Sequence, residues 1–179
     1  MKKKLLLKEV LNTSIYILVV LAISYAIVHF VGQRTVVIGS SMEYTLMDKD
    51  NLIVDKLSYR FNEPKRFDIV VFPYRFNRSM LYVKRIIGLP GETVQINEDG
   101  EIFINGERLY EGYGREIIEN PGIAAEPVYL ADDEYFVMGD NRNNSSDSRM
   151  PDVGNIKKSE LIGKVFIRIW PLREWGKVE

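Results

Sequence analysis

Hydrophobic residues follow two different patterns along the chain. Between Val10 and Gln33 there is no Asp, Glu, Lys or Arg, and apolar residues run almost unbroken through residues 15–31. Beyond Arg34 they occur instead in short β-branched and aromatic runs between glycine, proline, asparagine and aspartate. A long continuous run is typical of a membrane-spanning helix, and short runs between turn residues are typical of strands. The pattern therefore predicts one apolar helix followed by a β-domain.

The apolar run is long enough to cross a bilayer. With residues 11–14 it reaches roughly 20 residues, which as a helix spans the ~30 Å hydrocarbon core. Four lysines precede the run, and positive charge favours the cytoplasmic side of a membrane. A cleaved signal peptide is the alternative, because the tripeptide 22–24 (Ala-Ile-Ser) resembles a cleavage site. However, the run exceeds the ~7–15 residues usual for signal peptides and continues past that tripeptide, which favours a retained anchor.

The rest of the chain predicts an all-β, antiparallel domain. Asp99-Gly100 and Asn105-Gly106 separate apolar runs and are strong hairpin signals. Residues 157–161 alone resemble a helical turn. The predicted strands share β-branched or aromatic residues and flanking turn residues: 35–38, 51–57, 68–72, 81–87, 92–97, 101–105, 107–110, 128–130, 135–138 and 164–170.

These elements predict three parts in the chain. Residues 1–9 form a cytoplasmic basic tail, residues 10–33 a single transmembrane anchor, and residues 34–179 an extracytoplasmic β-domain. Residues 111–126 are irregular and rich in glycine and proline, so we expect a small inserted hairpin lobe at about 97–130.

Charge and composition exclude several function classes. The net charge is −1, but residues 1–34 carry +4 and the remainder holds 19 basic against 24 acidic residues. A domain this acidic is a poor nucleic-acid binder, because neutralising phosphates requires a basic face.

The chain has no cysteine and a single histidine, His29. Thiol catalysis, disulfides and Ser-His-Asp sites are therefore excluded, and zinc or another metal cofactor is disfavoured. His29 lies within the apolar run, so we expect an interfacial residue near the helix end. No cofactor is expected.

Residues 39–46 form the first of three polar segments. The small residues Gly39, Ser40 and Ser41 would let the backbone approach closely and leave amides free to face a ligand. A serine nucleophile beside an oxyanion site needs this arrangement, although Gly-Ser-Ser is also an ordinary turn.

The second segment, residues 81–92, contains a lysine on a predicted strand. Alternation places Lys84 on the face that carries Tyr82 and Ile86. A lysine there either extends its amine to solvent or is desolvated, with a lowered pKa. In the second case its neutral amine is a competent general base.

The third segment, residues 138–149, contains almost no apolar side chains after its first methionine. It is either a solvated turn or an internally paired loop. Its side chains offer both charge signs and three hydroxyls for such pairing: Asp140, Arg142, Asp147, Arg149, Ser145, Ser146 and Ser148.

Together the segments resemble the bacterial type I signal peptidases, membrane-anchored serine proteases with a Ser-Lys pair. Residues 41–46 (Ser-Met-Glu-Tyr-Thr-Leu) match the family's Ser-Met-x-Pro-Thr-Leu box. Residues 66–72 match its Arg-Gly-Asp-Ile-Val-Val-Phe box, and residues 82–92 and 139–149 match its lysine and final boxes. The order, spacing and amino-terminal anchor also agree. The resemblance implies an endopeptidase that removes signal peptides from secretory pre-proteins at the bilayer surface of the cell membrane.

The resemblance also implies roles for single residues. Ser41 would be the nucleophile, Lys84 the general base, and Ser145 the residue that orients the lysine amine. Asp147 and Arg149 would pair to hold their loop, and the Ser41 backbone amide would donate to the oxyanion. Shallow pockets for the small residues of an Ala-x-Ala-type cleavage site would be lined by Val37, Met42, Leu46, Tyr82 and Val83.

The chain departs from the family pattern at three positions. Tyr44 replaces the usual proline, Phe67 replaces the usual glycine, and Gly39 lacks the hydroxyl that some relatives use as a second oxyanion donor. Ser41 itself lies about eight residues beyond the anchor, so we expect an exposed apolar patch around it near the membrane.

Three alternatives remain for the function. A catalytically idle relative that assists surface-fibre assembly would have lost Ser41 or Lys84, and both are present. A self-cleaving repressor would need a DNA-binding module in place of the apolar helix. A plain anchored binding domain would not require the four ordered boxes.

Overall fold

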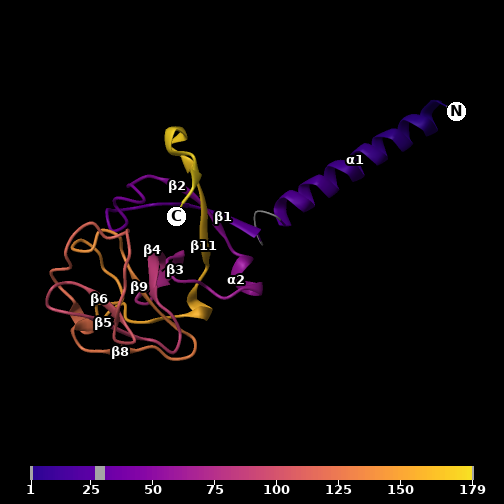
Figure 1. Ribbon diagram of the computed structural model, residues 1–179. Coiled ribbons are helices and arrows are strands. Elements are labelled where there is room, and N and C mark those ends of the chain that lie inside the picture. The colour runs from indigo at the N-terminus through magenta and orange to yellow at the C-terminus, as the bar shows by residue number, and fades with distance from the viewer. Residues whose placement is uncertain (1, 27–30, 179) are drawn as a thin grey trace.

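The computed structural model describes residues 2–26 and 31–178. Helix α1 (Lys2–Ala26) extends away from the sheets in Figure 1, and none of its segment Lys8–Ala26 is buried. That segment has a mean hydropathy of 1.6 and is long and apolar enough to cross a membrane. Of the remaining predicted anchor residues, 27–30, which include His29, lie outside the described residues. Gly32 and Gln33 belong to a strand instead.

The main sheet is antiparallel, as the hairpin signals predicted. In the described part of the chain its order is β1-β2-β11-β3-β4-β9-β10, with β12 paired to β11. The strands are β1 (Gly32–Val36), β2 (Asn51–Asp55), β3 (Ile69–Tyr74), β4 (Asn77–Gly88), β9 (Glu134–Met138), β10 (Ile156–Lys157), β11 (Gly163–Trp170) and β12 (Gly176–Lys177).

The single predicted helical turn was an underestimate. It corresponds to η3 (Lys158–Glu160), but α2 (Ser58–Phe61), η2 (Gly122–Ala125) and η4 (Leu172–Glu174) are helical as well. One-turn helices are too short to show a helical period, so the sequence pattern predicts only the turn around η3.

A second antiparallel sheet follows β4 and has the order β7-β6-β5-β8. Its strands are β5 (Thr93–Ile96), β6 (Ile102–Ile104), β7 (Glu107–Arg108) and β8 (Val128–Tyr129). Asn105 and Gly106 turn the chain between β6 and β7 with φ of 53° and 82°, as an Asn-Gly hairpin requires. The sheet begins at β5, before the predicted lobe 97–130, and the domain limits stay a prediction.

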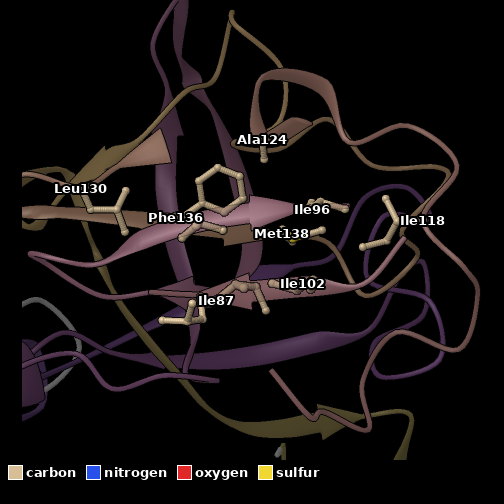
Figure 2. Close-up of a cluster of buried hydrophobic side chains, with 10 residues drawn as sticks. Ile87, Ile96, Ile102, Ile118, Ala124, Leu130, Phe136 and Met138 are labelled. Atoms are coloured by element: carbon tan, nitrogen blue, oxygen red, sulfur yellow. The ribbon is translucent and has the colours of Figure 1, made fainter. Parts of the chain in front are cut away.

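The two sheets share one hydrophobic core, so the second sheet is not an independent unit. Ile87, Phe136 and Met138 of the main sheet pack with Ile96 and other residues of the second (Figure 2). The remaining members of this cluster are Val94, Ile102, Ile104, Ile118, Ala124 and Leu130.

Two further clusters cover the main sheet. One contains Val70, Phe72, Ile86, Tyr135, Val137, Val153 and Ile156. The other joins strand residues to the segment after β1 and contains Val37, Met42, Leu46, Leu52, Val54, Ile69, Val71, Val83 and Val165. This last cluster positions the turn that carries Ser41.

Candidate active site

Ser41 lies in a turn between β1 and β2. Backbone bonds from Glu43 N to Ser40 O (3.0 Å) and from Leu46 N to Met42 O (2.8 Å) close the turn. Met42 and Leu46 are 1% and 0% exposed and fix the turn to the core beneath it. The side chain of Leu46 lies wholly in the core, and its predicted contact with substrate stays a prediction.

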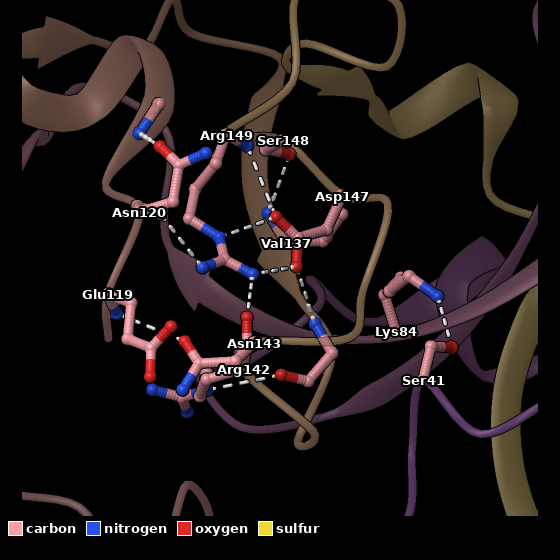
Figure 3. A network of polar contacts seen from close by, with 12 residues as sticks. Ser41, Lys84, Glu119, Asn120, Val137, Arg142, Asn143, Asp147, Ser148 and Arg149 are labelled. Atoms are coloured by element: carbon pink, nitrogen blue, oxygen red, sulfur yellow. Dashed lines mark hydrogen bonds and ion pairs between the residues drawn. The ribbon is translucent and has the colours of Figure 1, made fainter. Parts of the chain in front are cut away.

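Lys84 reaches Ser41 from the middle of β4. Its side chain is buried, and its Nζ lies 2.7 Å from Ser41 Oγ, within hydrogen-bond distance (Figure 3). Nζ also donates to the carbonyl of Val83 (3.1 Å) and lies 5.1 Å from the centre of the Tyr82 ring. Of the two environments considered for this lysine, the structure therefore has the desolvated one.

Burial lowers the pKa of the Lys84 amine from 10.5 to about 8. The nearby carboxylates of Asp147 and Asp140 oppose this change, whereas the Arg149 guanidinium adds to it. Desolvation is the largest of these effects because a charged amine loses its hydration in the protein interior. A sizeable share of Lys84 is consequently neutral near pH 8 and able to accept a proton.

The polar loop, residues 139–149, is an internally paired structure and not a solvated turn. Arg149 Nε donates to Asp147 Oδ1 (2.8 Å) and Nη2 to Asp147 Oδ2 (2.9 Å), which gives the predicted ion pair. Asp147 also accepts from Gly139 N (3.0 Å), and Arg149 donates to the carbonyls of Arg142 and Asn120 (Figure 3). Buried charges that are paired and hydrogen-bonded in this way hold a loop in one conformation.

The polar loop hydrogen-bonds directly to the turn that carries Ser41. Asn141 donates from its backbone to Ser41 O and from its side chain to Ser40 O, both at 3.1 Å. A Cβ at Gly139 would lie 2.3 Å from Ser41 O and 2.2 Å from Ser145 Oγ. Only glycine permits this close approach, so the glycine at the start of the loop determines how near it lies to Ser41.

Ser145 Oγ makes no hydrogen bond to Lys84, although the resemblance implied that it orients the lysine amine. Its Oγ is buried without a hydrogen-bond partner among the described residues, and it lies against the Gly139 backbone. The lysine amine instead bonds the carbonyl of Val83, its own neighbour on β4. Orientation of the lysine by Ser145 stays a prediction.

The sequence reasoning missed a second buried pair next to the site. Arg85 donates through Nε and Nη2 to the two carboxylate oxygens of Asp140 at 2.9 and 2.8 Å, and both side chains are 0% exposed. The guanidinium also lies 3.6 Å from the centre of the Tyr113 ring. The sequence signal for this pair is an arginine in the middle of an apolar strand, because a buried guanidinium needs a carboxylate partner.

A groove of about 660 Å³ runs past Ser41 and Lys84. Val37, Met42, Tyr82 and Val83, four of the predicted pocket residues, line it, and their contact with substrate stays a prediction. The other lining residues are Gln33, Arg34, Thr35, Val36, Ile38, Gly39, Ser40, Ser79, Met80, Leu81, Asn144 and Ser146.

Apolar side chains border the groove at its surface. Ile38 is 90% exposed, and Val36 and Met80 are 42% and 48% exposed. An exposed patch of this kind around Ser41 was expected from its closeness to the apolar helix.

The chain is similar to known signal peptidases over most of its length. The family model described as "Signal peptidase, peptidase S26" matches residues 8–170. The "Probable signal peptidase I-2" of Synechocystis sp. is 41% identical over 152 residues, which are 82% of this chain and 67% of that protein. The "Signal peptidase I" of Leptolyngbya laminosa is 40% identical over 156 residues, or 83% and 74% of the two chains.

A solved structure is also similar. The crystal structure of a signal peptidase I from Enterococcus faecalis is 34% identical and has a TM-score of 0.48, over 58% of this chain and 97% of that one. The family match spans both halves of the Ser41–Lys84 site, and the chain belongs to the signal peptidase family, peptidase S26.

Proposed function

We propose that Ser41 and Lys84 are the nucleophile and general base with which this signal peptidase I cleaves signal peptides from exported proteins. The observation that carries the proposal is the 2.7 Å distance between Lys84 Nζ and Ser41 Oγ, at a buried amine with a pKa lowered to about 8. A lowered pKa gives a lysine the neutral form that base catalysis requires.

The chemistry follows from this geometry. Neutral Lys84 takes the Ser41 hydroxyl proton as Oγ attacks the scissile carbonyl, and the Ser41 backbone amide donates to the resulting oxyanion. The protonated lysine then gives its proton to the departing amine, which leaves an acyl-enzyme. Water, activated by the same lysine, hydrolyses the acyl-enzyme and restores both residues.

The groove suits an extended peptide. Residues 77–85 of β4 pair with β3 on one side, but pairing of β4 with β9 begins only at Arg85. In the described part of the chain, no strand pairs with the edge of β4 before Arg85 on the groove side, so an added strand can pair there. The nearly buried valines Val37 and Val83 line the groove, and we expect them to form a shallow floor that favours small substrate side chains.

The proposed topology places this site at the membrane. Helix α1 would span the bilayer once with residues 1–9 in the cytoplasm, and residues 34–179 would form the extracytoplasmic catalytic domain. The four amino-terminal lysines support this orientation. A membrane-tethered enzyme meets a membrane-held signal peptide at a raised effective concentration. Protease added outside intact spheroplasts should then degrade the β-domain; full protection would contradict this topology.

The decisive experiment compares wild type with Ser41→Ala, as full chains in detergent, on a secretory precursor. Wild type should release the mature protein, and Ser41→Ala should not. Ser159→Ala, at an exposed serine of η3, is the matched control and should cleave like wild type. Equal cleavage by wild type and Ser41→Ala would reject the proposed nucleophile, and no cleavage by wild type would favour an idle relative or a binding domain.

A further inference from the structure

Tyr44 has an unusual backbone conformation beside the nucleophile. Its φ is +83°, in the left-handed region that side chains with a Cβ rarely occupy. It belongs to the same short turn as Ser41, which is closed by the bond from Leu46 N to Met42 O. Such strain persists only where surrounding contacts fix the conformation, so contacts from outside the turn are expected at Tyr44.

The contacts come from a segment remote in the sequence. The Tyr44 hydroxyl donates to Glu116 Oε1 at 2.9 Å, and the Arg115 guanidinium lies 5.3 Å from the centre of the Tyr44 ring. The hydrogen bond to the Glu116 carboxylate is the main reason that the pKa of Tyr44 is raised. The segment between β7 and η2 thus holds Tyr44, three positions after the nucleophile, in place.

Glu116 also reaches the polar loop. Its Oε2 accepts from Asn143 Nδ2 at 3.3 Å, so one carboxylate joins Tyr44 to Asn143. Asn143 is fixed to the same segment, because it donates to Ile117 O and accepts from Glu119 N, both at 3.0 Å (Figure 3). The turn and the loop are therefore joined through Glu116 as well as through Asn141.

Tyr44 does not line the groove, although Ser40, Ser41 and Met42 do. It can therefore act on the reaction only through the turn. We propose that Tyr44, Glu116 and Asn143 form a positioning bridge that holds the nucleophile turn against the polar loop and so sets the rate of turnover. This inference rests on the proposed roles of Ser41 and Lys84.

The bridge is expected to affect turnover more than folding. Tyr44 is 42% exposed and Glu116 is exposed, and hydrogen bonds in water contribute little to net stability. Attack geometry is far more sensitive, because a displacement of about 1 Å can cost roughly 100-fold in rate. A small shift of Ser41 relative to Lys84 would thus be visible in kcat before it is visible in unfolding.

The test uses the full chain in detergent with a secretory precursor. Tyr44→Phe removes only the hydroxyl, and Glu116→Ala removes its acceptor. Each should lower kcat about 10-fold with KM within about twofold, and leave the pH midpoint near 8 and Tm within about 4 °C of wild type. The double variant should lose no more than either single one, because both changes break the same bridge.

Tyr74→Phe is the matched control, because the Tyr74 hydroxyl donates to Asp152 Oδ2 at the same 2.9 Å and phenylalanine keeps the ring that stacks on Tyr82. It should retain wild-type kcat. The proposed bridge is rejected if Tyr44→Phe keeps the wild-type kcat. It is also rejected if the double variant loses as much kcat as both single variants together, or if the single variants change KM alone. In all three cases wild type still cleaves and the proposed function stands, whereas an inactive wild type overturns both.

Discussion

Two neighbouring basic side chains on opposite faces of β4 are both buried but differ in their ion pairing. Lys84 and Arg85 are adjacent and 3% and 0% exposed, but only Arg85 forms an ion pair in the described part of the chain, with Asp140. Lys84 has a serine hydroxyl and a carbonyl as its hydrogen-bond partners. Burial without a paired carboxylate yields a lysine that loses its proton near pH 8, and burial with one yields a permanently charged structural group.

The difference teaches how one strand serves both catalysis and structure. The Asp147 carboxylate near Lys84 is already paired with Arg149, so it raises the lysine pKa without cancelling the effect of burial. Were Asp147 free to pair with the amine, the lysine would remain charged and could not accept the proton of Ser41. The ion pair in the polar loop thus keeps Asp147 from pairing with the proposed base as well as holding the shape of the loop.

The largest expected effect on activity comes from removing the amine of Lys84. Lys84→Ala should lower kcat/KM by about 10³–10⁴-fold, because Ser41 loses its base. Its urea midpoint should not fall markedly, since no charged partner is left behind. Precursor cleavage and circular dichroism measure the two outcomes. Lys65→Ala, at an exposed lysine, is the control and should be fully active. More than a tenth of wild-type activity at neutral pH would exclude Lys84 as the base.

Removing the guanidinium of Arg85 should instead lower the stability of the fold. Arg85→Met leaves Asp140 as an uncompensated buried charge and should lower the free energy of unfolding by about 3–5 kcal/mol. The double variant Arg85→Met/Asp140→Leu should recover part of that loss, because it removes both charges. Urea unfolding measures both changes. Equal stabilities of the single variant and wild type would show that the pair does not matter to the fold.

The pH dependence of cleavage should follow Lys84. Because burial lowers the pKa of its amine to about 8, the active neutral form is lost as the pH falls through that value. Well below the midpoint, kcat/KM should decrease tenfold per pH unit, as expected for one proton. A rate profile between pH 6 and 10 on a substrate without titrating groups tests this. A flat profile across pH 7–9 would contradict a lysine base of this kind.

Part of this comparison could be predicted from the sequence. Alternation along β4 predicted that Lys84 and Arg85 lie on opposite faces. The resemblance of the ordered boxes to signal peptidases implied that Ser41 and Lys84 meet. The partner of Arg85 could not be predicted, because Asp140 is remote in sequence and period-2 reasoning gives a face but not a contact. The hydroxyl of Ser145 shows the same limit, since its position depends on packing against Gly139.

The positive φ angles of non-glycine residues could not be predicted from the local sequence either. Phe67, which replaces the glycine usual in the family box, has a φ of +72°, where glycine is favoured. Its ring compensates by packing on the shared core and lying 5.0 Å from the Tyr113 ring. Such compensation depends on tertiary contacts, which a propensity at one position does not contain.

The smallest expected effect comes from replacing Arg85 by lysine while keeping its partner Asp140. Arg85→Lys keeps a charge beside Asp140 but loses the two-point contact and the stacking on Tyr113, so it should cost about 1–2 kcal/mol. The cost should be the same at pH 7 and pH 9, because a lysine paired with a carboxylate stays protonated in the folded state, and an unpaired lysine in the unfolded chain has an ordinary pKa of about 10.4. The base at Lys84 behaves differently: its folded-state pKa is lowered to about 8, so the unfolded chain binds its proton more tightly and wild-type stability gains a contribution as the pH rises above 8. Urea unfolding at the two pH values measures the difference, with Lys84→Ala lacking that gain as the control. A cost of Arg85→Lys that shrinks at pH 9 would mean that the new lysine has a lowered folded-state pKa and loses its proton, and that position on β4, more than the paired carboxylate, decides whether a buried amine on this strand is charged.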